Sequence, residues 1–99
     1  MDVSTSSNNV HSVEVTVVNS HGLHARPVMR FVDTAIAYSA EVVVDKGEGT
    51  EQVDGKDPMR MMLLAAPKGT KLRIIARGDD APQALDALVA LIQDGFEED

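Results

Sequence analysis

The sequence predicts an α+β fold in which an antiparallel four-stranded sheet is covered on one face by three helices. Segments with strand-like alternation and segments with helical periodicity follow one another in the order β-α-β-β-α-β-α. The connections between them are short, and the two adjacent strand segments are separated only by a glycine-containing turn. Strands with one apolar face and short connections are typical of an antiparallel sheet whose second face is left open.

Size and composition narrow the class of protein. A chain of 99 residues can form one domain with a single core, and the absence of cysteine excludes disulfides and thiolate chemistry. The formal net charge of −7 and the low aromatic content, one Tyr and two Phe, argue against a nucleic-acid binder. No apolar run has the length of a membrane span, and residues 1–9 do not resemble a secretory signal. We therefore expect a cytoplasmic protein with no membrane insertion.

Residues 1–11 are rich in Ser, Asn and Thr and show no periodicity, so they are predicted to form a disordered leader that includes His11. The folded domain is expected to span residues 12–96, followed by a short acidic tail of residues 97–99. The first strand is predicted from Val13 onward, where apolar and polar residues alternate.

The first helix is predicted to begin at Ala25, with His24 as its N-cap, and to end near Tyr38 and Ser39. Pro27 falls in the first turn, where a missing N–H costs little. The glycine at position 22 allows a tight turn before the helix. Apolar residues recur at i, i+3 and i+4 spacing at Ala25, Val28, Val32, Ala35 and Ile36.

A hairpin is predicted next, with strands at residues 40–45 and 50–53. Asp57 as N-cap and Pro58 at the first helical position then begin a short second helix, which is expected to end near residues 65–66.

The fourth strand is predicted around Leu72 to Ala76, and Asp79 or Asp80 is expected to cap the third helix. Gly95 is expected to form the C-terminal cap of that helix. Its predicted core-facing residues are Ala81, Ala84, Leu85, Leu88 and Ile92.

Residues His24 and Arg26 suggest a site for a phosphoryl group. Arginine is disfavoured beside the positive end of a helix dipole, and a bound anion would explain its presence there. The neutral ring nitrogen of histidine is a nucleophile that can carry a covalent group. His24 is therefore a candidate phosphoryl acceptor, with a simple helix cap as its alternative and an ordinary surface cation as the alternative for Arg26.

Residues 22–27 match the signature Gly-(Leu/Ile)-His-x-Arg-Pro, and the chain thereby resembles HPr, the histidine-containing phosphocarrier family of the phosphoenolpyruvate-dependent phosphotransferase system. The similarity continues through Gly55-Lys56, the apolar run at residues 61–66 and residues 68–70, and covers roughly residues 13–96. It implies an open-faced β-sandwich of four antiparallel strands beneath three helices.

The resemblance also implies a function. Nδ1 of His24 would take a phosphoryl group from phosphorylated enzyme I and pass it to an enzyme II component, while Arg26 would stabilise the transferred charge. Gly22, Ala25 and Pro27 would complete the motif. The expected protein is a monomeric carrier that uses no cofactor and is not itself a turnover enzyme. An HPr-like regulatory module that docks to a metabolic enzyme or regulator is the alternative.

The methionine-rich second helix is apolar nearly all round, and the resemblance implies that it forms part of the partner surface. Met59 and Met62 are the predicted partner-binding residues, and full packing of this helix in the core is the alternative. Asp57 stands where many HPr proteins carry a regulatory serine. Its simplest role is to cap the helix, and the alternative is a fixed charge that alters partner docking.

His21, three residues before His24, raises the question of a metal site. The spacing is a weak zinc pattern, so no metal is expected and His21 is predicted to shape the loop.

Overall fold

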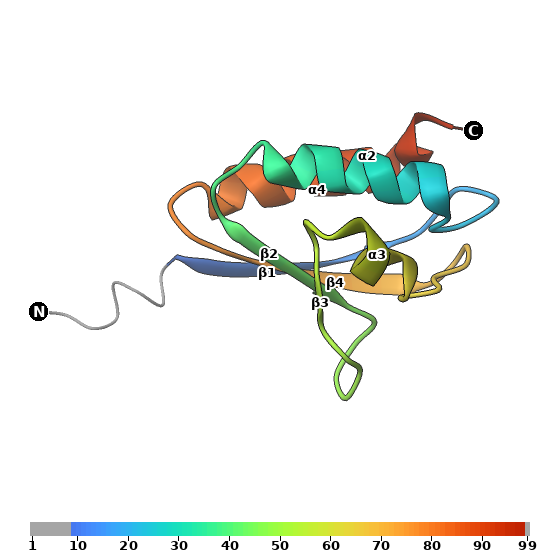
Figure 1. The fold of residues 1–99 in the computed structure, drawn as a ribbon, viewed down its shortest axis with the longest axis horizontal. Coiled ribbons are helices and arrows are strands. Elements are labelled where there is room, and N and C mark those ends of the chain that lie inside the picture. Colours follow the sequence, from blue (N-terminus) through green and yellow to red (C-terminus); the bar gives the residue numbers. More distant parts are fainter. Residues whose placement is uncertain (1–8, 99) are drawn as a thin grey trace, which may run out of the picture.

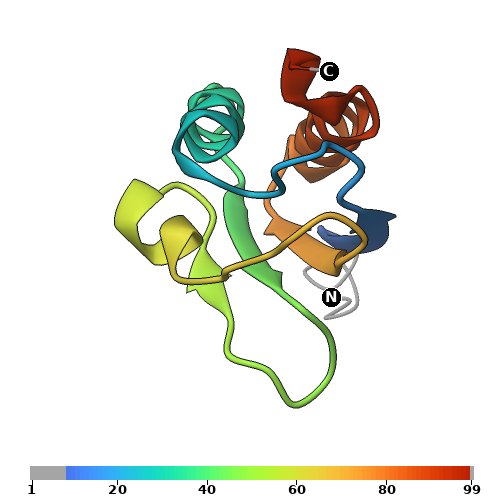
Figure 2. The same ribbon diagram turned by 90° about the vertical axis from the view of Figure 1, so that its right-hand side faces the viewer.

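The computed structural model describes residues 9–98, and within this range the chain forms one antiparallel sheet with the strand order β1-β4-β2-β3. The strands are β1 (Val10–Thr16), β2 (Glu41–Asp45), β3 (Val53–Asp54) and β4 (Lys71–Arg77). The helices are α2 (Ala25–Ile36), α3 (Pro58–Met62) and α4 (Ala81–Gln93), and a 3₁₀ turn, η1, follows at Gly95–Glu97. The helices lie on one side of the sheet, with α2 beside α4 (Figures 1 and 2). This arrangement confirms the predicted open-faced sandwich.

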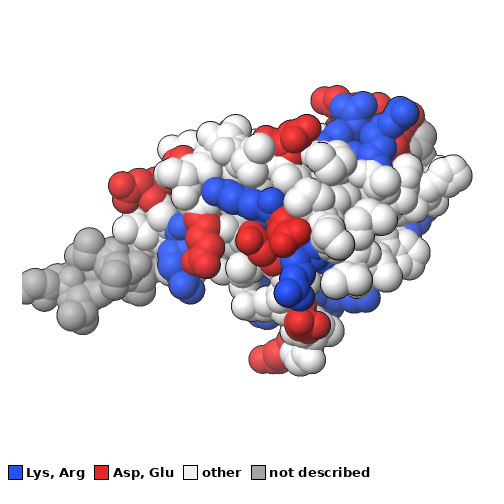
Figure 3. Space-filling model, in the orientation of Figure 1, with Lys and Arg blue, Asp and Glu red and all other residues white. Residues whose placement is uncertain are grey.

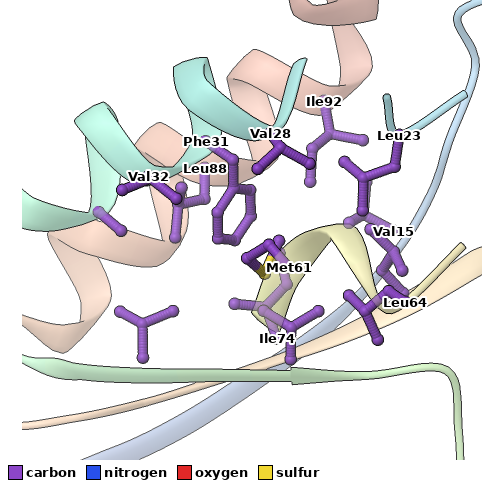
Figure 4. Close-up of a cluster of buried hydrophobic side chains, with 14 of the residues drawn as sticks. Val15, Leu23, Val28, Phe31, Val32, Met61, Leu64, Ile74, Leu88 and Ile92 are labelled. Carbon is purple, nitrogen blue, oxygen red and sulfur yellow. The ribbon is translucent and has the colours of Figure 1, made fainter. Parts of the chain in front are cut away.

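The core lies between the sheet and the helices. Ile74 in the central strand β4 is paired with Val13 of β1 on one side and with Val44 of β2 on the other. Alternate residues of β4 are buried because successive side chains of a strand point to opposite faces. Figure 4 shows side chains of α2, α3 and α4 meeting those of the sheet; they include Val28, Phe31, Met61, Ile74, Leu88 and Ile92.

The first strand begins earlier than the sequence predicted. His11 pairs with Ala76 in the sheet, so its assignment to a disordered leader is wrong. Residues 1–8 of the predicted leader lie outside the described residues. The alternation that marked the strand begins at Val13, and only the pairing with β4 extends it to Val10.

Three further element boundaries differ from the prediction, because side chains or tight turns form hydrogen bonds with the backbone groups there. The helix α2 ends at Ile36, before the predicted Tyr38, and the carboxylate of Asp80 accepts hydrogen bonds from the backbone N–H groups of Ser39 and Ala40. The hydrogen bond from Ser39 has the largest effect on the pKa of Asp80. Together with the bond from Ala40 it outweighs the effect of burial, so the pKa is lowered. Asp80 occupies the N-cap position of α4, but its side chain makes no capping hydrogen bond to that helix. It binds the backbone of the segment that follows α2 instead.

The hairpin strand β3 is short because Thr50 belongs to the turn. Its hydroxyl donates to the carbonyl of Gly47 and accepts from the N–H of Lys46. The helix α3 ends at Met62, before the predicted residues 65–66, because the next N–H groups bond three residues back and Ala65 has a positive φ of 50°. The C-cap residue of α4 is Asp94, and the predicted glycine, Gly95, follows it in the left-handed conformation at φ 69°.

Candidate functional site

The loop that carries His24 is held against the connection between α3 and β4. Gly22 has a φ of 69°, and a Cβ added there would lie 2.6 Å from the carbonyl oxygen of Ala66. The N–H of Leu23 donates to that same carbonyl at 2.8 Å. The buried amide of Asn19 donates to the carbonyl of Gly22 at 2.7 Å. Glycine is therefore required at position 22 both by its conformation and by close contact.

His24 is the N-cap of α2, as predicted. Its backbone is extended, with φ −103° and ψ −167°, and its carbonyl accepts the helical hydrogen bond from Val28 at 2.9 Å. The imidazole makes no capping hydrogen bond, and the side chain is 42% exposed. The backbone thus begins the helix while the ring remains available to other groups.

The C-terminal residues complete the surroundings of the ring. Nε2 of His24 lies 3.1 Å from Oε1 of Glu98, and the amide of Asn19 lies 3.4 Å from the same oxygen. Glu97 forms an ion pair with Arg30 at 3.0 Å. Acidic and basic side chains accordingly lie side by side where η1 meets α2 (Figure 3). Residues 97–98 are part of the site, so the prediction of a separate acidic tail is wrong for them; Asp99 lies outside the described residues.

Arg26 lies on the rim of an open hollow beside the ring. The hollow is lined by Ser20, His21, His24, Arg26, Glu97 and Glu98. Arg26 is exposed, and among residues 9–98 the structure shows no hydrogen bond or ion pair for its guanidinium. Its donors are thus available to an anion that enters the hollow. Ala25 and Pro27 lie in the first turn of α2, where the sequence placed them.

His21 lies near the ring of His24. The two ring centroids are 5.9 Å apart, with the planes at 78°. In the described part of the chain, no group of three or more His, Cys, Asp or Glu side chains is arranged to hold a metal ion. None of the described helices is long and apolar enough to cross a membrane.

The short helix α3 has one buried and one exposed side. Met61 is completely buried, whereas Met59 is 79% exposed and Met62 is also exposed. The alternative in which the whole helix packs in the core is therefore wrong. Leu63, which belongs to the apolar run but is not one of the predicted partner-binding residues, extends this exposed apolar side. In a helix of five residues, the mixture of buried and exposed side chains gives no clear periodicity. The exposed side of α3 therefore could not be predicted from the periodicity of the sequence.

Asp57 uses its side chain as a helix cap. Its Oδ1 accepts from the N–H groups of Met59 and Arg60, at 3.0 and 3.3 Å. This geometry accounts for an aspartate at the start of α3 without any effect on a partner.

Comparison with known proteins assigns the family. The family model described as the PTS HPr component phosphorylation site matches residues 11–94. The chain belongs to the HPr family. It is 44% identical over 88 residues to the phosphocarrier protein HPr of Pseudomonas aeruginosa, a match that covers 88% of this chain and 96% of that protein.

Two further similar proteins agree with this assignment. The chain is 40% identical over 90 residues to the multiphosphoryl transfer protein of Salmonella typhimurium, covering 90% of this chain and 24% of that longer protein. The crystal structure of HPr-C-His from Thermoanaerobacter tengcongensis superimposes with a TM-score of 0.83 at 36% identity, covering 90% of this chain and 98% of that one. The predicted family and the predicted fold are both confirmed.

Proposed function

We propose that this HPr-family chain is a phosphocarrier of the phosphotransferase system, with Nδ1 of His24 as the phosphoryl acceptor. The observation that carries the proposal is the half-exposed imidazole at the start of α2, beside a guanidinium that has no partner among the described residues. Phosphorylated enzyme I would supply the group, and an enzyme II component would receive it.

The geometry suits a group that must pass between two proteins. Phosphoryl transfer requires mainly positioning and stabilisation of charge. The N-terminus of α2, which has no acidic residue in its first turn, favours an anion, and the donors of Arg26 are arranged to meet phosphate oxygens. An exposed ring lets a donor and an acceptor protein reach the same atom in turn.

The chain would act as a carrier and not as a turnover enzyme. In the first step, the Nδ1 lone pair forms the N–P bond as the bond from phosphorus to the donor breaks. In the second, the N–P bond breaks, its electron pair returns to Nδ1, and the acceptor takes the group. We infer that the carrier is a monomer, because both partners would use the surface around His24. We also infer that it acts in the cytoplasm.

The exposed side of α3 is the proposed docking surface for these partners. Met59 and Met62 present flexible thioether side chains, which can adapt to partners of different shape. The contacts between α2 and α3 place this surface next to the helix that begins at His24.

The test is phosphorylation in vitro with phosphoenolpyruvate and enzyme I. We expect acid-labile, base-stable phosphate on the wild-type protein and on His21→Ala, and none on His24→Ala. Arg26→Ala should accept phosphate about tenfold or more slowly at an unchanged unfolding temperature, because it removes a charged donor from the site. Label that persists in His24→Ala would disprove the acceptor. Absence of label on the wild-type protein, with capture of a metabolic enzyme, would favour the regulatory module.

A further inference from the structure

The segment after α4 has an unusual backbone. Gly95, Phe96 and Glu97 have consecutive φ values of 69°, 58° and 64°. The left-handed conformation is disfavoured for residues with a side chain, and it persists only where surrounding contacts determine it. Phe96 supplies that contact, because its side chain is completely buried in the core. Burial of Phe96 therefore fixes the path of the residues that follow.

This path brings two neighbouring carboxylates to different places. Glu97 is 62% exposed and pairs with Arg30 at the surface. Glu98 is 17% exposed and lies against Nε2 of His24 at 3.1 Å. The buried Asn19 amide contacts both the carbonyl of Gly22 and the carboxylate of Glu98, and so links the His24 loop to the end of the chain.

We propose that Glu98 is a positioning residue that holds His24 in the tautomer protonated on Nε2. The inference rests on the proposed function of His24. An ionised carboxylate can only accept hydrogen bonds, so the nitrogen that faces it must carry the proton. The hydrogen bond at one ring nitrogen sets the state of the other. The lone pair of the neutral ring is then on Nδ1, the atom that would attack phosphorus.

The same contact serves both directions of transfer. When Nδ1 bonds to phosphorus, the proton stays on Nε2 and the ring gains a positive charge, which the carboxylate of Glu98 offsets. When the N–P bond breaks, the electron pair returns to Nδ1. The ring becomes neutral again, and Nε2 keeps its proton. The other ionisable groups around the ring are His21, Arg26 and Glu97, and Glu97 is paired with Arg30.

The tautomer can be measured directly by ¹⁵N NMR of the unphosphorylated protein at a pH where the ring is neutral. We expect the Nε2–H form of His24 to dominate in the wild-type protein. Glu98→Ala should lower the ratio of Nε2–H to Nδ1–H about tenfold or more, the effect of losing one hydrogen bond to a charged group. Glu98→Gln should fall between them, because an amide oxygen still accepts a hydrogen bond.

Glu97→Ala is the matched control, since it removes a carboxylate from the adjacent residue without touching the ring. It should leave the tautomer ratio unchanged. Phosphoryl acceptance from enzyme I should slow about tenfold in Glu98→Ala and remain normal in Glu41→Ala, which removes an exposed carboxylate at the start of β2, outside the lining of the hollow. An unchanged ratio in Glu98→Ala, or an equal change in Glu97→Ala, would overturn the role of Glu98. If the role of Glu98 were overturned but His24 were still labelled normally, the proposed function would stand. An unlabelled wild-type protein would instead contradict the proposed function.

Discussion

The carboxylate of Asp45 is completely buried and makes a two-pronged contact with the guanidinium of Arg73, the residue directly opposite in the sheet. Nη2 and Nε of Arg73 lie 2.7 and 3.1 Å from the two carboxylate oxygens, and the N–H of Gly47 donates at 2.9 Å. Burial by itself would raise the pKa of Asp45. The hydrogen bonds from Arg73 and Gly47 and the charge of Arg73 outweigh it, so the pKa is lowered.

The first prediction concerns acid stability. Because the pKa of Asp45 is lower in the folded than in the unfolded chain, its contribution is complete above about pH 4 and is lost as the pH falls through the folded value. Asp45→Asn should reduce the free energy of unfolding by about 2 kcal/mol at pH 7, and this difference should shrink in acid. Urea unfolding of both proteins at pH 7 and in acid measures this difference in unfolding free energy.

The exposed pair of Glu41 and Arg77, 3.6 Å apart, provides the control for this first prediction. Glu41→Gln should change the unfolding free energy by less than about 0.5 kcal/mol. If Asp45→Asn were equally mild at pH 7, the buried pair would not stabilise the fold as argued.

The second prediction concerns the turn before His24. Gly22→Ala should destabilise the protein by about 3 kcal/mol, because it adds a Cβ against the Ala66 carbonyl and strains a positive φ. Gly49→Ala is the matched control, with a φ of 85° and no atom within 4 Å of the added Cβ. It should cost only about 1 kcal/mol. Equal losses of unfolding free energy in the two variants would contradict the close contact.

The third prediction separates the two sides of α3. Met61→Ala should reduce the free energy of unfolding by about 3 kcal/mol, because it leaves a cavity in the core. Met59→Ala should change stability by less than about 0.5 kcal/mol and instead raise the concentration of carrier needed for half-maximal phosphorylation by enzyme I. Calorimetry and steady-state labelling measure the two effects. Unimpaired labelling of Met59→Ala would remove Met59 from the docking surface.

The fourth prediction concerns the start of α3. Asp57→Ala should cost about 1 kcal/mol through loss of the cap, whereas Asp57→Ser should cost only a few tenths, since serine caps almost as well. If capping is the whole role, Asp57→Ser leaves the rate of phosphoryl transfer unchanged. A rate that rises in both variants would instead show that the fixed charge weakens docking.

Most elements of the fold follow from local signals. The periodicity from Ala25 onward, the pair Asp57-Pro58 and the alternation around Ile74 each reflect a preference that acts within a few residues. Boundaries were less predictable where distant groups supply the hydrogen bonds. The carboxylate of Asp80 binds backbone groups 40 and 41 residues earlier in the chain, and no pattern near Ser39 announces it.

The sequence by itself determined the family, the order of the elements and the placement of His24 and Arg26 at the start of a helix, because these depend on neighbouring residues. Only the tertiary structure decided which side of α3 is exposed and which group faces Nε2 of His24. Glu98 is 74 positions from His24, and it reaches the ring because the burial of Phe96 holds the chain in a left-handed turn. Such a contact depends on how the completed core directs the chain, which local sequence preferences do not specify.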